Sequence, residues 1–427
     1  MKINAVHQPQ GGASGATTPQ TTGKARTKPH ITVLHAFHNY LSPTENWAYN
    51  LMQATPNVNR VVAARRLLPQ NFFAPNTTYL PLPLYGPLSN PRKSLAIAAY
   101  NIAHRQFLKR YPAFLAKARP DIDLVHAHFG PVGYFYRRLR KLLGKPLVVS
   151  FYGRDYEHVP HVKPEWHPKY QELFQLADCF VCEGPHGAGT LAHIGCPPDK
   201  IVVNPLGVRP EHIPVLRRHK APERLDLLQI ASVTGKKGHV FALEAFIAAS
   251  TSCPNATLTF VGSARAPADQ SILDSLLRRV ADAGLADRVK FVPGIDYARL
   301  YDFLKDFDVF IHPSVYTEDR DCEGGAPVVL LDAQATGMPV ISTTHCDIPS
   351  EVIDGETGLL APERDVGGFA AHIRRFYAMD ASEYQGFCKR ARKHVEEQYD
   401  IARNAVALRD IYQDVIDRAA PSKRRGR

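Results

Sequence analysis

The amino-acid sequence predicts an α/β protein of two consecutive domains, each a parallel sheet wound with helices on both faces. Short apolar runs alternate with longer amphipathic stretches along the chain, the pattern of strand–helix–strand units. This alternation is interrupted once, at 208–223, where three prolines and several charges predict a linker. A chain of 427 residues with 44% hydrophobic content is long enough to build a core in each half.

Residues 31–207 are predicted to form the N-terminal domain, preceded by a flexible tail at 1–30 that lacks the apolar segment of a secretory signal. After the first strand, Ser42, Pro43 and Glu45 fit a helix start, with serine as the cap, proline in the first position and glutamate three residues on. The strands of this domain are expected at 31–37, 60–63, 124–128, 147–151, 179–182 and 201–204.

Residues 224–396 are predicted to form the C-terminal domain, followed by a helix at 397–418 that could pack back across the linker and by a basic tail at 419–427. Ligands of such sheets bind outside the carboxyl ends of the strands, so a cleft shared by the two domains is the expected site. The strands of this domain are expected at 227–230, 257–261, 289–292, 309–312, 340–343 and 359–361.

Composition narrows the function classes. No run approaches the ~20 apolar residues of a membrane-spanning helix, and an odd count of seven cysteines favours a reducing, cytoplasmic compartment over a disulfide framework. Cys179 and Cys182, three apart on a predicted strand, face opposite sides and indicate structural burial. The net charge of +11 favours an anionic partner, but no nucleic-acid recognition module is present, so nucleic acid is not expected.

Two basic segments, 104–119 and 136–145, mix Lys and Arg with aromatic residues and leucines at helical spacing. Such a surface suits peripheral contact with anionic lipid headgroups. It is equally the pattern of a solvated basic face on an ordinary amphipathic helix. Both interpretations stay open at the level of the sequence.

The stretch 318–343 predicts an anion site. It reads as an acidic, glycine-rich loop, then a helix capped by Pro327 and ended by Gly337, then a buried strand. Backbone N–H groups at such a helix start converge on phosphate oxygens, and glycines let a ligand approach closely.

The run 323–342, EGGAPVVLLDAQATGMPVIS, resembles the donor-site motif of the retaining, GT-B-fold family 4 glycosyltransferases, especially the bacterial ones that build exopolysaccharide or lipid-linked oligosaccharides. The resemblance implies two Rossmann-like domains facing a central cleft, with the acceptor on the N-terminal side and a nucleotide-sugar donor on the C-terminal side. Further matching pieces are DLVHAHFG at 123–130, SFYGRD at 150–155, GCPPDK at 195–200, PLGV at 205–208, KKG at 236–238 and DGETGLL at 354–360.

The resemblance also implies donor-site residues. Lys237 matches the lysine that stabilises the diphosphate leaving group, while Ser232 stands where the family has a partnering arginine, so Lys236 could supply the missing charge. Asp332 replaces the second of two family glutamates, one residue farther along than usual, and would accept hydrogen bonds from the ribose hydroxyls. The loop expected to cradle the phosphates comprises Gly324, Gly325, Ala326, Pro327 and Val328.

For catalysis, the resemblance assigns contact with the donor sugar to His128 and Glu323. Tyr152, which stands where the family has a histidine, is predicted to face the acceptor, together with Asp155 and Glu45. His126 and His128 alternate onto one face of a strand and invite a metal interpretation, but no third ligand follows at a recognisable spacing. No metal and no cofactor are therefore expected, because the nucleotide-sugar is a substrate.

The predicted function is transfer of a sugar, with retention of configuration, from a nucleoside-diphosphate-sugar to a hydroxyl of a carbohydrate acceptor that is lipid-linked. The reaction is expected in the cytoplasm, with peripheral association on the inner face of the cytoplasmic membrane as a further expectation. The alternative is a scaffold or binding subunit of the same fold with little or no activity, which Ser232 and Asp332 motivate.

Overall fold

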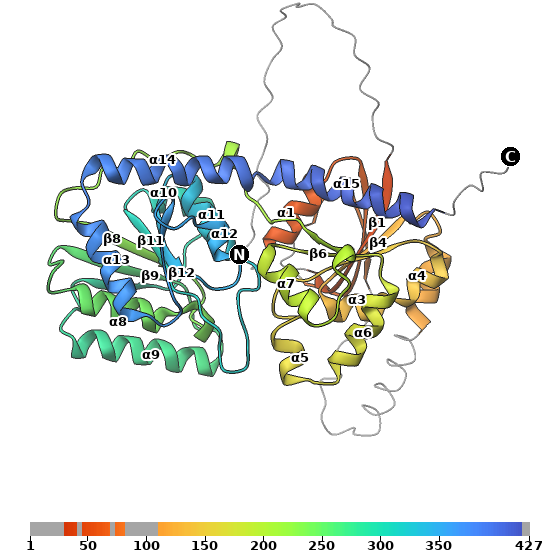
Figure 1. Cartoon of the computed structure of the whole chain (residues 1–427), viewed down its shortest axis with the longest axis horizontal. Coiled ribbons are helices and arrows are strands. Elements are labelled where there is room, and N and C mark those ends of the chain that lie inside the picture. The colour runs from red at the N-terminus through yellow and green to blue at the C-terminus, as the bar shows by residue number, and fades with distance from the viewer. Residues whose placement is uncertain (1–29, 41–44, 69–72, 82–109, 421–427) are drawn as a thin grey trace, which may run out of the picture.

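The computed structural model of the chain describes residues 30–40, 45–68, 73–81 and 110–420. Figure 1 shows two domains of sheet and helix next to each other, with a pair of long helices, α14 (Ala381–Gln398) and α15 (Ile401–Ala419), running across both. Each domain is built on a parallel sheet, in the order β3-β2-β1-β4-β5-β6-β7 in the first and β10-β9-β8-β11-β12-β13 in the second. The predicted fold class is confirmed.

The N-terminal sheet contains every strand that the sequence predicted, and β1 and β2 are longer than expected. It also contains β3, an edge strand that the sequence analysis missed because its residues TTYLP include two polar threonines and a proline. The strands are β1 Ile31–Tyr40, β2 Val58–Leu67, β3 Thr77–Pro81, β4 Leu124–His128, β5 Leu147–Ser150, β6 Cys179–Cys182 and β7 Ile201–Val203. On β6, Cys179 and Cys182 pack into different hydrophobic clusters, as their spacing predicted.

The first helix of this domain corrects one prediction. Glu45 is the N-cap residue of α1, and its side chain makes no capping hydrogen bond. The predicted capping box, with Glu45 three residues into the helix, is therefore wrong. Ser42 and Pro43 lie outside the described residues. The helices of the domain are α1 Asn46–Ala54, α3 Gly130–Tyr136, α4 Arg138–Leu143, α5 His158–Val162, α6 Trp166–Leu176 and α7 Pro185–His193, and residues 110–118 are helical as well.

The C-terminal domain has the six predicted strands with boundaries within two residues of expectation. Its strands are β8 Leu225–Ile230, β9 Ala256–Val261, β10 Val289–Val292, β11 Val309–His312, β12 Val340–Thr343 and β13 Gly358–Ala361. Its helices are α8 His239–Ala249, α9 Pro267–Asp282, α10 Leu300–Leu304, α11 Val328–Ala335, α12 Ile348–Glu351 and α13 Val366–Ala378.

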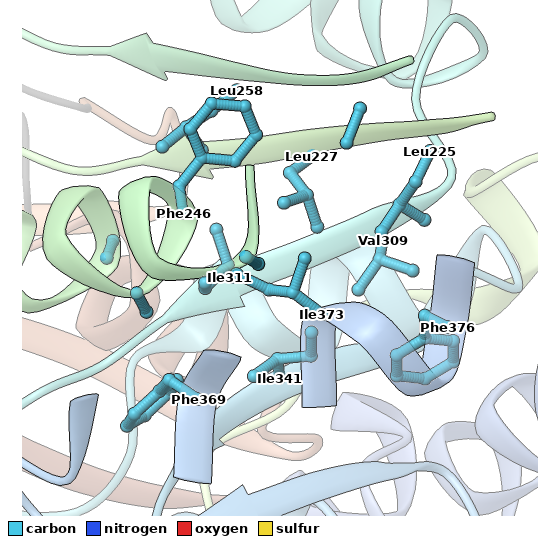
Figure 2. Packing of buried hydrophobic residues seen from close by; sticks show 14 of the residues in the cluster. Leu225, Leu227, Phe246, Leu258, Val309, Ile311, Ile341, Phe369, Ile373 and Phe376 are labelled. Atoms are coloured by element: carbon cyan, nitrogen blue, oxygen red, sulfur yellow. The ribbon is translucent and has the colours of Figure 1, made fainter. Parts of the chain in front are cut away.

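One face of this second sheet packs against α8 and α13. Figure 2 shows Leu227 of β8 and Ile311 of β11 lying between Phe246 of α8 and Ile373 of α13. All four side chains are at most 1% exposed, and burying each contributes roughly 1.5–3 kcal/mol. This core fixes the carboxyl ends of β8, β11 and β12, from which the donor-side loops emerge.

The predicted helix at 397–418 is wrong in its boundary, because the structure breaks it at Tyr399 and Asp400, between α14 and α15. Tyr399 is the C-cap of α14, and Asp400 caps α15 by accepting a hydrogen bond from Ala402 N at 2.8 Å. An aspartate used in this way competes with continued helix. The break lets α15 pack on the N-terminal domain, where Leu408 and Tyr412 join the cluster beneath its sheet. That packing confirms the predicted return across the linker.

The basic segments behave as amphipathic helices. Tyr136 and Leu139 are buried in the core, while Arg138 and Lys141 are exposed. Residues 104–109 of the other segment lie outside the described residues. Within the described ranges, none of the helices combines the length and the apolar character that crossing a membrane requires.

Candidate active site

The glycine-rich loop lies directly before α11, whose N-cap is Pro327, and Gly337 with φ +84° follows its C-terminal end. The predicted helix limits are therefore confirmed. Gly324 has φ +85°, a conformation that only glycine adopts without strain, so the loop can turn its N–H groups toward the space in front of the helix. The N-terminal end of α11 thus offers unsatisfied donors together with the positive end of a helix dipole.

Lys237 reaches this loop from the turn after β8. Its Nζ lies 2.6 Å from Oε2 of Glu323, and Ser314 Oγ donates to Oε1 of that glutamate at 3.3 Å. The turn depends on Gly238, because a Cβ there would lie 1.8 Å from the carbonyl oxygen of Pro313. The structure therefore brings together the two residues that the sequence assigned to diphosphate binding and to the donor sugar.

The pair is charged although it is nearly enclosed, with side chains 18% exposed for Lys237 and 6% for Glu323. Burial opposes ionisation of the glutamate, but Lys237 and Lys236 outweigh it and lower the pKa of Glu323 to about 2. Each group is the counter-ion of the other. An incoming diphosphate would compete with Glu323 for the Lys237 ammonium.

The neighbouring donor-side residues are engaged in other contacts. Lys236 donates to the carbonyl oxygen of Cys322 at 2.8 Å and lies 3.3 Å from Asp321, so it braces the acidic loop. Ser232 is half-buried in the loop between β8 and the lysine turn. Asp332, 7% exposed on α11, accepts a hydrogen bond from Tyr301 of α10 at 3.0 Å. The ribose role of Asp332 stays a prediction.

The N-terminal domain meets the glycine-rich loop through the turn after β5. A Cβ on Gly153 would lie 1.9 Å from the Cα of Gly324, and Tyr156 donates to the carbonyl oxygen of Gly324 at 2.9 Å. Asp155 is 2% exposed, and both of its carboxylate oxygens accept backbone hydrogen bonds at this turn. The donors are Gly130 N at 2.8 Å and Tyr152 N at 2.9 Å. Asp155 therefore holds the turn in place, and its role on the acceptor side stays a prediction.

A second carboxyl of the N-terminal domain lies against the loop. Gly325 donates its N–H to Glu183, and a Cβ at Gly325 would overlap Oε2 of Glu183. Burial and the nearby Asp347 raise the pKa of Glu183 well above its usual value. An acidic side chain thus occupies the position in front of α11 where phosphate oxygens are expected.

His128 lies in a buried cluster of histidines. Its Nδ1 hydrogen-bonds with the Tyr152 hydroxyl at 2.7 Å and its Nε2 with His35 Nδ1 at 3.2 Å. His126 hydrogen-bonds with Tyr412 of α15 at 2.6 Å and with Ser150 at 2.7 Å. Burial lowers the pKa of all three histidines, so the imidazoles are neutral at physiological pH.

The structure adds a third histidine, His35, to the two that the sequence spacing had placed together. His35 lies on β1 directly opposite His126 of β4, and the ligand atoms of His35, His126 and His128 all lie within 4.8 Å of one another. Ring nitrogens of each are already hydrogen-bonded within the chain, so protein partners satisfy the cluster. The absence of a metal from the mechanism stays a prediction, as does contact between His128 and a sugar.

A further group of side chains across the cleft escaped the sequence analysis. Glu157 of the N-terminal domain lies 2.7 Å from Arg320 and accepts a hydrogen bond from Tyr316 at 2.9 Å, and Tyr316 also hydrogen-bonds with His186 at 3.0 Å. His158 pairs with Asp319 at 3.3 Å. These contacts, here called the interdomain latch, join residues 130 to 163 positions apart in the chain, so no local pattern predicted them.

Behind the latch, Cys346 follows β12. Its Sγ lies 3.2 Å from Nε2 of His345, whose Nδ1 lies 2.7 Å from Glu363. Burial opposes ionisation of the Cys346 thiol, but hydrogen bonds from Cys322, His186 and His345 lower its pKa. The position of the His-Cys pair just past the carboxyl end of a strand was a signal that could have found it.

Comparison with known proteins matches two family models to the chain, "Glycosyltransferase Family 4" over residues 69–212 and "Glycosyl transferases group 1" over residues 216–394. The chain is 30% identical over 334 residues to the amylovoran biosynthesis glycosyltransferase AmsK of Erwinia amylovora, covering 77% of this chain and 78% of that protein. It is 33% identical over 282 residues to the putative colanic acid biosynthesis glycosyltransferase WcaL of Salmonella typhimurium, covering 65% and 67%.

Solved structures share the fold at low identity. The sucrose-phosphate synthase of Thermosynechococcus elongatus superposes with a TM-score of 0.71 at 19% identity, over 91% of this chain and 100% of that one. Anabaena Alr3699/HepE in complex with UDP and glucose gives a TM-score of 0.66 at 14% identity, over 90% and 100%. On its two Rossmann-like domains, its matched family models and these relatives, the chain belongs to the family 4 glycosyltransferases of the GT-B fold.

Proposed function

We propose that this glycosyltransferase moves a sugar, with retention of configuration, from a nucleoside-diphosphate-sugar to a hydroxyl of a lipid-linked carbohydrate during exopolysaccharide assembly. The observation that carries the proposal is the buried Lys237–Glu323 pair in front of α11, at the contact between the two domains. Two relatives support it, since their names assign them to colanic acid and amylovoran biosynthesis. The HepE structure contains UDP and glucose.

The chemistry follows from what these residues can supply. Departure of the leaving group builds negative charge on the donor diphosphate, which a fixed ammonium and aimed N–H groups stabilise in a water-poor site. On binding, the diphosphate takes the Lys237 ammonium from Glu323 and the Gly325 N–H from Glu183. Glu323, freed from the ion pair, then lies beside the donor sugar. No metal ion enters this proposal.

Domain closure completes the site. The Gly153 turn and the Gly324 loop are in direct contact, so the domains would have to separate to admit a donor between these turns and close again around it. Closure excludes water that would otherwise hydrolyse the donor. We assign the reaction to the cytoplasm, at the inner face of the membrane, on the support of seven free cysteines and the exposed Arg110 and Lys117 of the first basic segment.

A panel of nucleotide-sugars tests the proposal in two stages. Donor binding is measured first, as the rise in melting temperature that a specific ligand produces by mass action. Release of free nucleoside diphosphate is then measured with a lipid-linked oligosaccharide as acceptor. Stabilisation by one donor followed by acceptor-dependent release supports the proposed reaction. Binding of a donor without release would instead support the scaffold that Ser232 and Asp332 motivate.

A further inference from the structure

A cavity of about 710 Å³ lies in the N-terminal domain, beside the acceptor-side turn. It is bounded by the carboxyl end of β1, by α3, by the turn after β5, and by the starts of α5 and α6. A volume of this size falls within the range of pockets that bind small organic ligands. The walls are mainly apolar and aromatic, and they include Phe37, Val132, Tyr134, Phe135, Val159 and Trp166.

The walls are held in place before any ligand binds. Figure 1 shows α3 and α6 next to each other, and the rings of Tyr134 and Trp166 pack edge to face across them with centroids 5.8 Å apart. At the start of α3, a Cβ on Gly130 would lie 2.2 Å from the ring of Phe151, so this helix sits as close to the sheet as a glycine permits. The apolar surface is therefore preformed.

Three arginines also line the cavity, and two have hydrogen-bonding capacity to spare. Arg137 is neutralised by Glu172 at 2.8 Å and stacks on Tyr134. Arg138 is exposed and has no hydrogen bond or ion pair within the described ranges, and Arg154 contacts only His158, at 3.5 Å. The carboxylates in the lining are Asp155, already bound by backbone N–H groups, and Glu45.

An apolar wall lined also by guanidinium groups with N–H donors still available matches one ligand chemistry. That ligand is a long apolar chain that ends in a phosphate or diphosphate. The cavity also adjoins the predicted reaction centre. Phe37, one of its walls, stacks on His128 with ring centroids 4.2 Å apart, and Phe129 packs against Tyr152 at 4.9 Å. A ligand held here would present its polar end to the contact between the domains.

We propose that this cavity binds the lipid of the acceptor, with the apolar chain against α3 and α6 and the phosphate or diphosphate at Arg138 and Arg154. The inference rests on the proposed function and deepens it, because it assigns the lipid-linked substrate to a site of its own. The sugar that follows the phosphate then extends toward the Gly324 loop, where the donor is bound.

The two tryptophans of the chain make a direct test possible. Trp166 lines the cavity and Trp47 does not, so Trp47→Phe leaves a single reporter in the full-length protein. Farnesyl monophosphate, kept below its aggregation limit, should change Trp166 emission in a saturable way. Farnesol, which lacks the phosphate, should bind at least tenfold more weakly, and inorganic pyrophosphate, which lacks the chain, should leave the emission unchanged.

Variants in this background separate the two parts of the site. Arg138→Gln and Arg154→Gln should each weaken farnesyl monophosphate at least fivefold and leave farnesol unaffected. Lys141→Gln is the matched control, since it removes an exposed charge from the same helix α4 outside the cavity, and it should change neither affinity. Phe135→Ala, checked for folding by circular dichroism, should weaken both ligands because it removes part of the apolar wall.

Equal affinity for farnesyl monophosphate in wild type and both arginine variants would overturn the assignment, as would the absence of a saturable signal. Binding to anionic vesicles without binding to the monomeric probe would assign the arginines to the membrane surface instead. The donor panel runs in parallel. If a nucleotide-sugar stabilises the chain but the lipid probe does not bind, only the cavity assignment fails. If the lipid probe binds but no nucleotide-sugar stabilises the chain, the cavity assignment stands and the proposed sugar transfer is overturned.

Discussion

At the scale of single residues, the Lys237–Glu323 pair shows how two charges are kept in a nearly enclosed position. An unpaired ammonium or carboxylate would be costly there, and each group removes that cost for the other. In the proposed reaction, a donor diphosphate would offer the lysine a stronger partner and release the glutamate when the sugar arrives.

Lys237→Ala is expected to lower kcat by about 100-fold, because the lost ammonium stabilises charge that develops in the transition state. The measurement is nucleotide release under saturating donor and acceptor. Lys305→Ala serves as control, since Lys305 pairs only with the exposed Asp302 on the surface of the same domain. A Lys237→Ala enzyme with unchanged kcat would remove this residue from the mechanism.

The stability of the chain should depend on pH through Glu323. Its pKa falls from 4.5 in the unfolded chain to about 2 in the folded one. The unfolded state therefore binds the proton more readily, and the contribution of this carboxylate to stability is present above pH 4.5 and is lost as pH falls toward 2. A shift of this size corresponds to about 3 kcal/mol.

Chemical denaturation at a series of pH values measures this contribution in wild type and in Glu323→Gln. The difference in unfolding free energy between the two proteins should shrink as pH is lowered from 5 to 2, because only the wild type has the ionisable carboxyl at this position. A difference that stays constant across this range would show that the Glu323 carboxylate is not stabilised in the folded chain.

At the scale of elements, the site depends on two tight turns from different domains that touch through glycines. The turn after β5 and the loop before α11 approach so closely that neither has room for a side chain at Gly153 or Gly324. The loop that makes this contact lies between Glu323 and Asp332, which stands one residue farther along than the family pattern has it. A bulky loop would hold the domains apart.

Gly324→Ala should separate the two turns, because its Cβ would lie 2.1 Å from the carbonyl oxygen of Tyr152, and its φ of +85° adds strain. Gly355→Ala is the matched control, with φ +75° in the same domain and no heavy atom within 4 Å of the added Cβ. Both variants should lose about 1 kcal/mol of stability to backbone strain. Only Gly324→Ala should also lose donor-induced stabilisation and activity; equal activity in the two variants would argue against the contact.

At the scale of the whole molecule, the two domains are joined by the interdomain latch and by α15, which returns to the N-terminal domain. Glu157 is the centre of the latch, since it accepts from both Tyr316 and Arg320. Burial opposes ionisation of Glu157, but its hydrogen bonds with His186, Arg320 and Tyr316 lower its pKa to about 2. It is therefore a carboxylate throughout the physiological range.

Arg320→Gln is expected to weaken the latch and shift the ligand-free enzyme toward an open form, with a larger radius of gyration in small-angle X-ray scattering and a faster association of donor. Arg375→Gln is the control, because Arg375 pairs with Glu383 inside the C-terminal domain. A radius of gyration that is the same in wild type and both variants would show that the Glu157–Arg320 pair does not hold the domains together.

The sequence by itself predicted every strand of the two sheets except β3, together with the limits of helix α11. Apolar periodicity, a proline before a helix and a glycine after it are local signals, so the strands at 124–128, 289–292 and 340–343 and the limits of α11 could be read directly. Lys237 was found because its motif is contiguous. The edge strand β3 and the break before α15 were missed where local composition was ambiguous.

The tertiary structure alone decided the partners. His35 joins His126 and His128 only because β1 and β4 are neighbours in the sheet, and Tyr412 reaches His126 across 286 residues of sequence. Glu183 lies in front of α11, and Glu157 meets Arg320, because the two domains are in contact. The sequence shows which chemical groups the chain contains and how far apart they lie along it. Which of them share a buried, low-dielectric space is set by packing between segments far apart in the chain, and that packing governs their charge and chemistry.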